Sequence, residues 1–224
     1  MKRVGQVVAL AIGLLALTAR TASAVPLIDG AIGVGEWDAA FVIGGDPNEV
    51  GIPDSYDLSG IRVLQDVSGD ADDGLYVLLT TYAAPSLVDS GVGPPPALIA
   101  LNFDYNGDLD FADAVDRFTT QTTTDPFKVF NGTGTLLFTG VEGTNFKLGS
   151  VVEYYIPSGT AGTPVPSTFT GFAIYDNGGD APDDRLPNTG FFTPVPEPSS
   201  LLLLGLGGLG FLGAGVRGRK WLRI

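Results

Sequence analysis

Short runs of alternating residues recur along the middle of the chain, and they constrain its fold more than any other feature. Between Val25 and Val195 these runs are rich in β-branched and aromatic residues and are separated by Gly, Pro, Asn and Asp clusters, with no helical stripe. The clearest runs are Ile61–Val67, Leu75–Tyr82, Ala97–Tyr105, Phe127–Phe130, Thr135–Val141, Val151–Ile156 and Phe169–Tyr175. The pattern predicts an all-β fold, an antiparallel two-sheet sandwich of jelly-roll-like type.

One of these runs, Leu75–Tyr82, is apolar on both faces. Leu75 and Val77 begin one face, and Tyr76 and Leu78 begin the other. A strand that is apolar on both faces is typical of a position well inside a packed structure. We therefore expect this run to be a central strand of the sandwich.

Residues 1–24 have the features of a secretory signal peptide. A positively charged start precedes an apolar run from Val7 to Leu17, and Ala22-Ser23-Ala24 is a small-x-small cleavage signature. Such a segment is removed on export and is not part of the fold. We expect the mature protein to begin at Val25, and residues 25–194 are enough for one domain with a single core.

Residues 195–224 contain a second targeting segment. An uncharged apolar run of 16 residues, Leu201–Val216, is followed directly by a basic tail. A helix of this length spans about 24 Å, which is short for a bilayer, but snorkelling basic side chains extend its reach. Because positive flanks stay on the cytoplasmic side, we expect a C-terminal transmembrane helix with the preceding domain outside.

A Pro-Glu-Pro triplet stands just before the apolar run. Two prolines hold the backbone extended and remove hydrogen-bond donors, so the triplet forms an accessible strip above the membrane. With the helix and the Arg-rich end that follow, the segment resembles the sorting signal of bacterial PEP-CTERM proteins. The residues that match the motif are Val195, Pro196, Glu197, Pro198, Ser199 and Ser200.

The resemblance implies recognition by an exosortase, a transpeptidase-like membrane enzyme that removes the helix during export. It also implies export across the inner membrane to the cell surface or extracellular matrix, often in bacteria that make exopolysaccharide. The alternative is a permanent tail anchor preceded by a proline-bearing linker.

The charge and composition of the mature domain exclude several functions. If the C-terminal cut falls after Glu197, five basic residues in the mature domain stand against 25 acidic ones, a net charge near −20. Such a charge repels nucleic acid and anionic lipid, so we expect neither as a partner. The chain has no cysteine and no histidine, which excludes disulfides, thiol nucleophiles, Ser-His-Asp relays and the usual zinc or copper sites.

The opening of the mature chain, Ile28–Phe41, combines an Asp-Gly turn with a Glu-Trp pair. It resembles the start of family 9 carbohydrate-binding modules and related DOMON-like β-sandwiches, as do Asp73–Tyr82, Leu101–Asp108 and Val152–Pro157 in order. The resemblance implies a sandwich fold and sugar binding by a pair of tryptophans. Only Trp37 lies in the mature domain, and large aromatic residues usually enter the core. We expect Trp37 to be a buried plug at one end of the sandwich rather than a sugar platform.

The sharpest chemical feature is the acidic stretch DYNGDLDFADAVD, which begins at Asp104. Oxygen side chains spaced by two in a turning loop converge as the hard ligands of calcium do. The candidate ligands are Asp104, Asn106, Asp108, Asp110, Asp113 and Asp116. The first three match the EF-hand pattern, but Leu109 replaces the Gly of the turn and Val115 replaces the bidentate Glu. We predict an EF-hand-like calcium loop; the alternative is a solvated hairpin loop with Asn106-Gly107 in its tight turn.

Three other polar stretches have simpler expected roles. Residues 70–73 and 180–184 form acidic clusters that are expected to be plain loops, with ion binding as the alternative. The threonine-rich stretch Thr119–Thr124 is expected to be an exposed strand, with an O-glycosylated patch as the alternative.

Three functions follow from these features. The first is an exported, non-catalytic sandwich that binds polysaccharide or matrix and is stabilised by calcium, and the second is a structural surface protein without a specific ligand. The third is a carboxylate-based glycoside hydrolase, because carboxylates are the available acid–base groups. Its candidate residues are Glu36, Glu49, Glu142 and Glu153. None of them stands in a recognisable catalytic signature, so we expect a protein that is not an enzyme.

Overall fold

A computed structural model describes residues 25–44, 46–66, 69, 71–87, 97–122, 125–160, 169–176 and 184–193. The regular elements of this part of the chain are strands. They are β1 (Phe41–Gly44), β2 (Leu58–Asp66), β3 (Gly74–Thr81), β4 (Leu98–Asp104), β5 (Arg117–Thr122), β6 (Lys128–Asn131), β7 (Leu136–Thr139), β8 (Phe146–Leu148), β9 (Val152–Pro157), β10 (Thr170–Asp176) and β11 (Asp184–Leu186). The predicted signal peptide and C-terminal helix lie outside the described residues.

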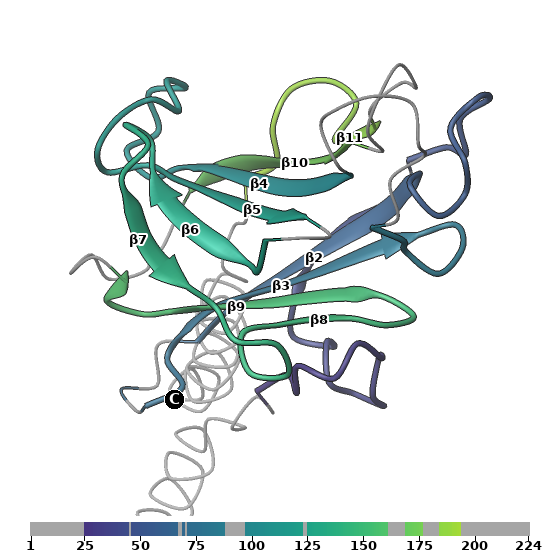
Figure 1. The fold of residues 1–224 in the computed structure, drawn as a ribbon, viewed down its shortest axis with the longest axis horizontal. Coiled ribbons are helices and arrows are strands. Elements are labelled where there is room, and N and C mark those ends of the chain that lie inside the picture. The colour runs from purple at the N-terminus through teal and green to yellow at the C-terminus, as the bar shows by residue number, and fades with distance from the viewer. Residues whose placement is uncertain are drawn as a thin grey trace, which may run out of the picture.

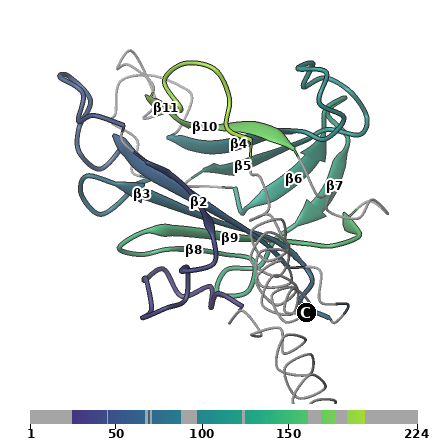
Figure 2. The same ribbon diagram turned by 180° about the vertical axis from the view of Figure 1, so that it is seen from behind.

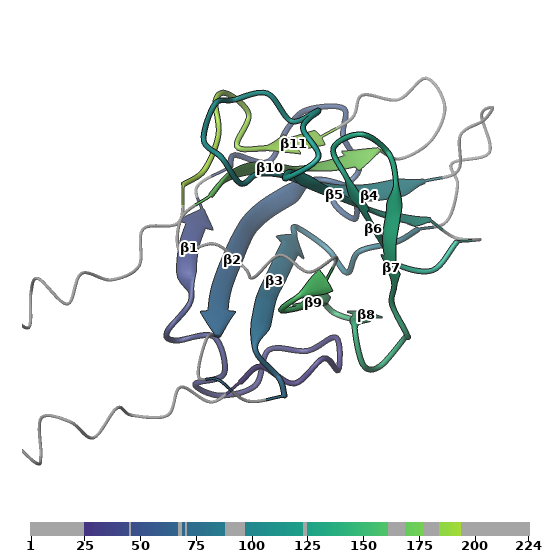
Figure 3. The same cartoon turned by 90° about the vertical axis from the view of Figure 1, so that its left-hand side faces the viewer.

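These strands form two antiparallel sheets. The five-stranded sheet has the order β1-β2-β3-β9-β8, and the six-stranded sheet has the order β11-β10-β4-β5-β6-β7. Figures 1 and 2 show the two sheets as separate layers from opposite sides, and Figure 3 shows β1, β2 and β3 following one another across the first sheet. The predicted two-sheet sandwich is confirmed.

The chain crosses from one sheet to the other twice in the same direction, and the strands of the second crossing pair with those of the first. This arrangement is jelly-roll-like. Consecutive strands β3 and β4 lie in different sheets, and so do β9 and β10. Later in the chain β9 returns to pair with β3, and β10 pairs with β4. The centre of each sheet is therefore built from strands far apart in sequence.

Each of the seven predicted runs overlaps a strand, while the short strands β1, β8 and β11 have no counterpart among them. The stretch Thr119–Thr124 overlaps β5, so a strand was correctly expected there. The expectation that it is exposed was wrong, because Thr119 and Gln121 are buried. Gln121 is held inside by a hydrogen bond of 2.7 Å to its Oε1 from the hydroxyl of Tyr154.

The main core fills the space between the two sheets. Alternate residues of β3 and β4 form its centre, and edge-to-face aromatic contacts close one end, where the ring centroids of Phe103 and Phe169 are 5.3 Å apart. The central buried residues are Leu75, Val77, Leu79, Ile99, Leu101 and Phe103.

A second apolar cluster covers the opposite face of the five-stranded sheet. Tyr76 and Leu78 of β3 pack there against Ile28 and Trp37 of the N-terminal segment, residues 25–40. Figure 1 shows this segment, in purple, beneath the sheet. Strand β3 is thus buried on both faces, which confirms its predicted central position.

Trp37 is buried as expected, with 1% of its surface exposed, but it does not close an end of the sandwich. It lies against the outer face of the five-stranded sheet, because that face of β3 is apolar and needs a cover. Its Nε1 donates a hydrogen bond of 3.2 Å to Oε1 of Glu153 on β9. The expectation of an end plug is therefore corrected to a cover of the sheet face.

Glu153 holds the N-terminal segment to the sheet. Its carboxylate is buried, and its Oε2 accepts hydrogen bonds from the backbone N–H groups of Asp29 at 2.9 Å and Gly30 at 2.7 Å. Burial raises the pKa of Glu153, and the hydrogen bonds from Gly30, Asp29 and Trp37 oppose that rise. The carboxylate satisfies three donors that would otherwise be buried without a partner.

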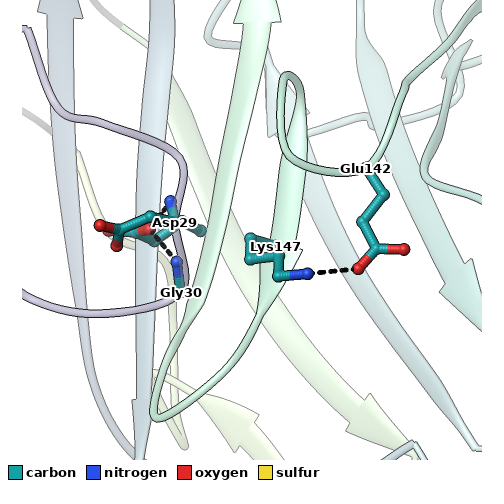
Figure 4. Close-up of polar contacts among 5 residues, drawn as sticks. Asp29, Gly30, Glu142 and Lys147 are labelled. Atoms are coloured by element: carbon teal, nitrogen blue, oxygen red, sulfur yellow. Dashed lines mark hydrogen bonds and ion pairs between the residues drawn. The ribbon is translucent and has the colours of Figure 1, made fainter.

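The same turn makes a close backbone contact with the segment before β9. Figure 4 shows the Asp29-Gly30 turn close to Lys147, which forms an ion pair of 2.6 Å with Glu142. Gly30 has a φ of 80°, and a Cβ atom there would lie 3.0 Å from the backbone of Gly149. Glycine is therefore required at both positions for the segment to dock.

We predict that Glu153→Gln lowers the free energy of unfolding by about 2–4 kcal/mol, because the amide offers one acceptor and places an NH₂ group against buried donors. Trp37→Phe should cost less, about 1–2 kcal/mol, because it keeps a ring and removes one hydrogen bond. Chemical denaturation followed by circular dichroism measures both.

The control is Glu142→Gln, which alters an exposed ion pair and should change the free energy of unfolding by less than about 1 kcal/mol. Equal losses for Glu142→Gln and Glu153→Gln would contradict the anchoring role of Glu153.

Candidate functional site

The predicted calcium loop, residues 104–116, connects β4 to β5. Asp104 and Asp116 stand at its two ends and are fully buried, whereas Asn106, Asp108 and Asp110 are exposed along its length. The end residues are buried because the sheet holds them, and the middle of the loop extends into solvent. Of the six predicted ligands, two are therefore buried and the other four are more accessible.

Asp104 orders the first half of the loop. Its Oδ1 accepts hydrogen bonds from the N–H groups of Asn106 at 3.1 Å and Gly107 at 2.5 Å, and its Oδ2 accepts one from Leu109 at 2.7 Å. The carboxylate or amide oxygens of Asn106, Asp108 and Asp110 each accept a bond from the N–H two residues ahead. These consecutive turns are the local structure that Asp and Asn favour.

Asp116 closes the second half of the loop. Its Oδ1 accepts a hydrogen bond from the N–H of Tyr105 at 2.9 Å, and its Oδ2 accepts one from Asp113 at 3.1 Å. Burial raises the pKa of Asp116, and these two backbone bonds oppose the rise. Nearby, the guanidinium of Arg117 donates to the carbonyl oxygens of Ala114, Val115 and Asp116. Both ends of the loop are thus tied together.

Leu109 occupies the position where an EF-hand loop has glycine, and it adopts the backbone conformation that the glycine would have. Its φ is 68°, the one positive φ of a residue other than glycine in the described part of the chain. The backbone at Leu109 therefore has the left-handed conformation that glycine would adopt there, although the residue departs from the pattern. Asn106 Nδ2 donates to Asp108 Oδ2 and Asp113 Oδ2, so three of the candidates already touch. Calcium binding by this loop stays a prediction.

A row of aromatic side chains runs across the outer face of the six-stranded sheet. Phe172 of β10, Asn102 of β4, Phe118 of β5 and Phe130 of β6 stand opposite one another in register. All four side chains are half-buried. The rings of Phe118 and Phe130 are nearly parallel, at 10° and 4.9 Å between centroids. We call these four residues the outer aromatic row.

The acidic loop borders one end of this row. The ring of Phe111, in the loop, lies 5.1 Å from that of Phe172 and 5.2 Å from that of Phe191. The guanidinium of Arg185 lies 4.3 Å from the centre of the Phe172 ring, a cation–π contact. The loop and the outer aromatic row therefore form one continuous surface.

A separate carboxylate group was missed by the sequence analysis. Asp46, Glu49 and Asp184 each place an oxygen within 4.8 Å of the others, the one group of this kind in the described residues. Burial raises the pKa of Asp184 to about 7, with further repulsion from Asp46 and Glu49 and an opposing hydrogen bond from the N–H of Leu58. Burial likewise raises the pKa of Asp46 to about 6.

This group corrects one expectation about residues 180–184, since Asp184 is not in a plain loop but is buried at the start of β11. Glu49 and Asp184 are 135 residues apart in the sequence. The contact of β11 with the start of β2 and the hydrogen bond from Asn188 to Glu49 bring them together. In the 70–73 cluster, Asp73 accepts hydrogen bonds from the N–H of Gly69, as expected of a loop.

The other glutamates proposed for catalysis have structural partners. Glu36 accepts hydrogen bonds from the backbone N–H groups of Leu27 and Gly33. Glu142 forms the exposed ion pair with Lys147, and Glu153 is occupied by the N-terminal anchor. Each of these three glutamates therefore has a structural partner.

Comparison with known families places residues 194–220 in the PEP-CTERM protein-sorting motif. The chain carries a PEP-CTERM sorting motif. The motif implies export, sorting to the cell surface or extracellular space, and processing by an exosortase-type enzyme. It includes the predicted residues Val195, Pro196, Glu197, Pro198 and Ser199, which lie outside the described residues. The match agrees with the resemblance that those residues suggested.

No curated protein and no solved structure matches the chain. The resemblance to family 9 modules and DOMON-like domains is therefore unsupported, and the Asp-Gly and Glu-Trp residues behind it serve the N-terminal contact. In the described residues no helix is long and apolar enough to span a membrane. The apolar run Leu201–Val216 before the end of the PEP-CTERM motif lies outside them.

We predict that Leu109→Gly raises the free energy of unfolding by about 0.5–1 kcal/mol. The left-handed conformation costs a leucine roughly 1–2 kcal/mol, and glycine removes that cost. The greater conformational entropy of glycine in the unfolded chain offsets part of this gain. The Leu109 side chain is 57% exposed, so little apolar contact is lost.

The matched control is Ala112→Gly in the same loop, an exposed position without a positive φ, which should lose about 0.5–1 kcal/mol. Chemical denaturation compares the two variants, and destabilisation by both would show that Leu109 is not strained.

Proposed function

We propose that this protein is an exported, non-catalytic component of the cell surface or extracellular matrix that binds extracellular polysaccharide through the outer aromatic row. The observation that carries the proposal is a PEP-CTERM motif attached to a sandwich with an aromatic outer face. The motif supports the location, and the row supports the ligand. The strong negative charge argues against nucleic acid and anionic lipid as partners.

The geometry of the row suits a carbohydrate chain. Four residues on adjacent strands span three strand spacings, about 14 Å, which favours an extended ligand over a single sugar. The rings of Phe118 and Phe130 stack on each other and form a compact apolar ridge that can contact the apolar side of a sugar ring. The amide of Asn102, between Phe172 and Phe118, supplies both a donor and an acceptor to hydroxyl groups.

Calcium in the acidic loop is a second part of the proposal. Asp108, Asp110 and Asp113 lie near Phe111, which joins the loop to the aromatic row. A calcium ion held there would bridge the acidic domain to anionic sugars, whose charge the protein would otherwise repel. Calcium would also stabilise the domain, by about 2.7 kcal/mol at a hundredfold excess over Kd.

The sorting part of the proposal predicts that an exosortase-bearing host removes the C-terminal helix. Mass spectrometry of the exported protein should show a chain that ends near Glu197, because the extended Pro-Glu-Pro strip is accessible to the enzyme. Intact Trp221 on the mature species in such a host would restore the permanent tail anchor. A host without the enzyme is the control and should retain the tail.

The binding part predicts weak retention of the exported protein on the purified exopolysaccharide of its host, with Kd between about 1 mM and tens of micromolar. A Phe118→Ala, Phe130→Ala double variant should bind at least about tenfold more weakly, a loss near 1.4 kcal/mol, because the apolar contact area of the two rings is gone. Affinity electrophoresis with calcium and with chelator measures this.

The control is Val42→Ala, an exposed apolar residue on the five-stranded sheet, which should bind like the unaltered protein. If the unaltered protein is not retained in either condition, the structural surface protein without a ligand is the better description. Released sugar would instead indicate a hydrolase.

A further inference from the structure

Four acidic side chains gather where the segment between β1 and β2 meets β11. Asp46, Asp57 and Asp184 are at most 6% exposed, and Glu49 is half-buried. Three buried oxygens among them accept no hydrogen bond: Asp46 Oδ2, Glu49 Oε2 and Asp57 Oδ1. Buried carboxylate oxygens without a donor or a cation are costly, and a bound cation would remove that cost.

No basic side chain in the described residues neutralises the group. The two ion pairs of this part of the chain, Lys128–Asp125 and Lys147–Glu142, lie elsewhere. Arg185 follows Asp184 directly, but alternation along β11 turns it to the outer face, where it contacts Phe172. The uncharged amide of Asn188 donates to Glu49 Oε1, and the backbone N–H of Glu49 donates to Asp57 Oδ2.

The geometry points to a divalent cation site, and we propose that Asp46, Glu49 and Asp184, assisted by Asp57, bind calcium. Oxygens that share a calcium ion at 2.3–2.6 Å lie at most about 5 Å apart, and those of Asp46, Glu49 and Asp184 lie within 4.8 Å. The carboxylate-only donor set suits a hard cation. Magnesium is less suited, because it retains several waters that a buried site has little room for.

This site differs from the acidic loop in position and consequence. Asp46 and Glu49 belong to the segment that leads into β2 of the five-stranded sheet, while Asp184 begins the edge strand of the six-stranded sheet. The Asp184 carboxylate also accepts a hydrogen bond from the N–H of Leu58, the first residue of β2. A bound ion would therefore cross-link the two sheets, close to the end of the domain that precedes the sorting motif.

The test is thermal unfolding of the full chain in a non-ionic detergent, with calcium chloride and with chelator. Calcium at about 10 mM, a hundredfold above the roughly 10⁻⁴ M Kd of extracellular calcium modules, should raise Tm by roughly 5–10 °C. Asp184→Asn should lose most of this rise. In chelator the same variant should melt above the unaltered protein, because it removes one of the crowded charges.

A second variant and a second readout distinguish loss of cation binding from a folding defect in Asp184→Asn. Glu49→Gln should behave like Asp184→Asn. Asp108→Asn is the same kind of change in the acidic loop, and it should keep the part of the calcium-induced rise in Tm that comes from the site of Asp46, Glu49 and Asp184. Terbium bound here should luminesce by energy transfer from Tyr82, whose hydroxyl donates to the carbonyl of Asp46, and Tyr82→Phe should reduce that signal.

The opposite outcomes overturn the proposal. They are an unchanged Tm in the unaltered protein, or a calcium-induced rise that Asp184→Asn and Glu49→Gln retain in full. Loss of the rise in Asp108→Asn alone would place calcium only in the acidic loop, and equal destabilisation by Asp184→Asn in both conditions would reduce Asp184 to a hydrogen-bond partner of Leu58.

Discussion

The buried carboxylate of Glu153 is the contact on which the five-stranded sheet depends. Strand β3 is apolar on both faces, so the face turned away from the main core must be covered. Glu153 holds the covering segment by accepting hydrogen bonds from Asp29, Gly30 and Trp37. A carboxylate can do this because three donors surround it and offset the cost of removing its charge from water.

The buried carboxylates elsewhere in the domain also depend on nearby hydrogen-bond donors. Where backbone N–H groups are available, as around Asp104 and Asp116, buried carboxylates are satisfied and the loop between them is ordered. At Asp46, Glu49 and Asp184 the donors are too few, and repulsion between neighbours remains. The carboxylates of the two acidic regions therefore differ in how they are satisfied, although their composition is similar.

The domain separates its structural and its exposed aromatic residues by sheet face. Trp37, the one tryptophan of the mature domain, is buried in the segment that covers the five-stranded sheet. The six-stranded sheet leaves Phe118, Phe130 and Phe172 half-exposed on its outer side, beside the acidic loop. A surface ligand of an exported protein with a sorting motif would meet this face.

Local patterns by themselves determined the sorting motif, the all-β class and the central position of β3, because alternation and short motifs act within a few residues. They also predicted a turning acidic loop after Asp104, where Asp and Asn bond to the N–H two residues ahead. The tertiary structure alone decided the partners of Glu153, the in-register row from Phe172 to Phe130 and the meeting of Glu49 with Asp184. Those contacts join residues that are distant in sequence, and strand pairing across and between the sheets sets which of them become neighbours.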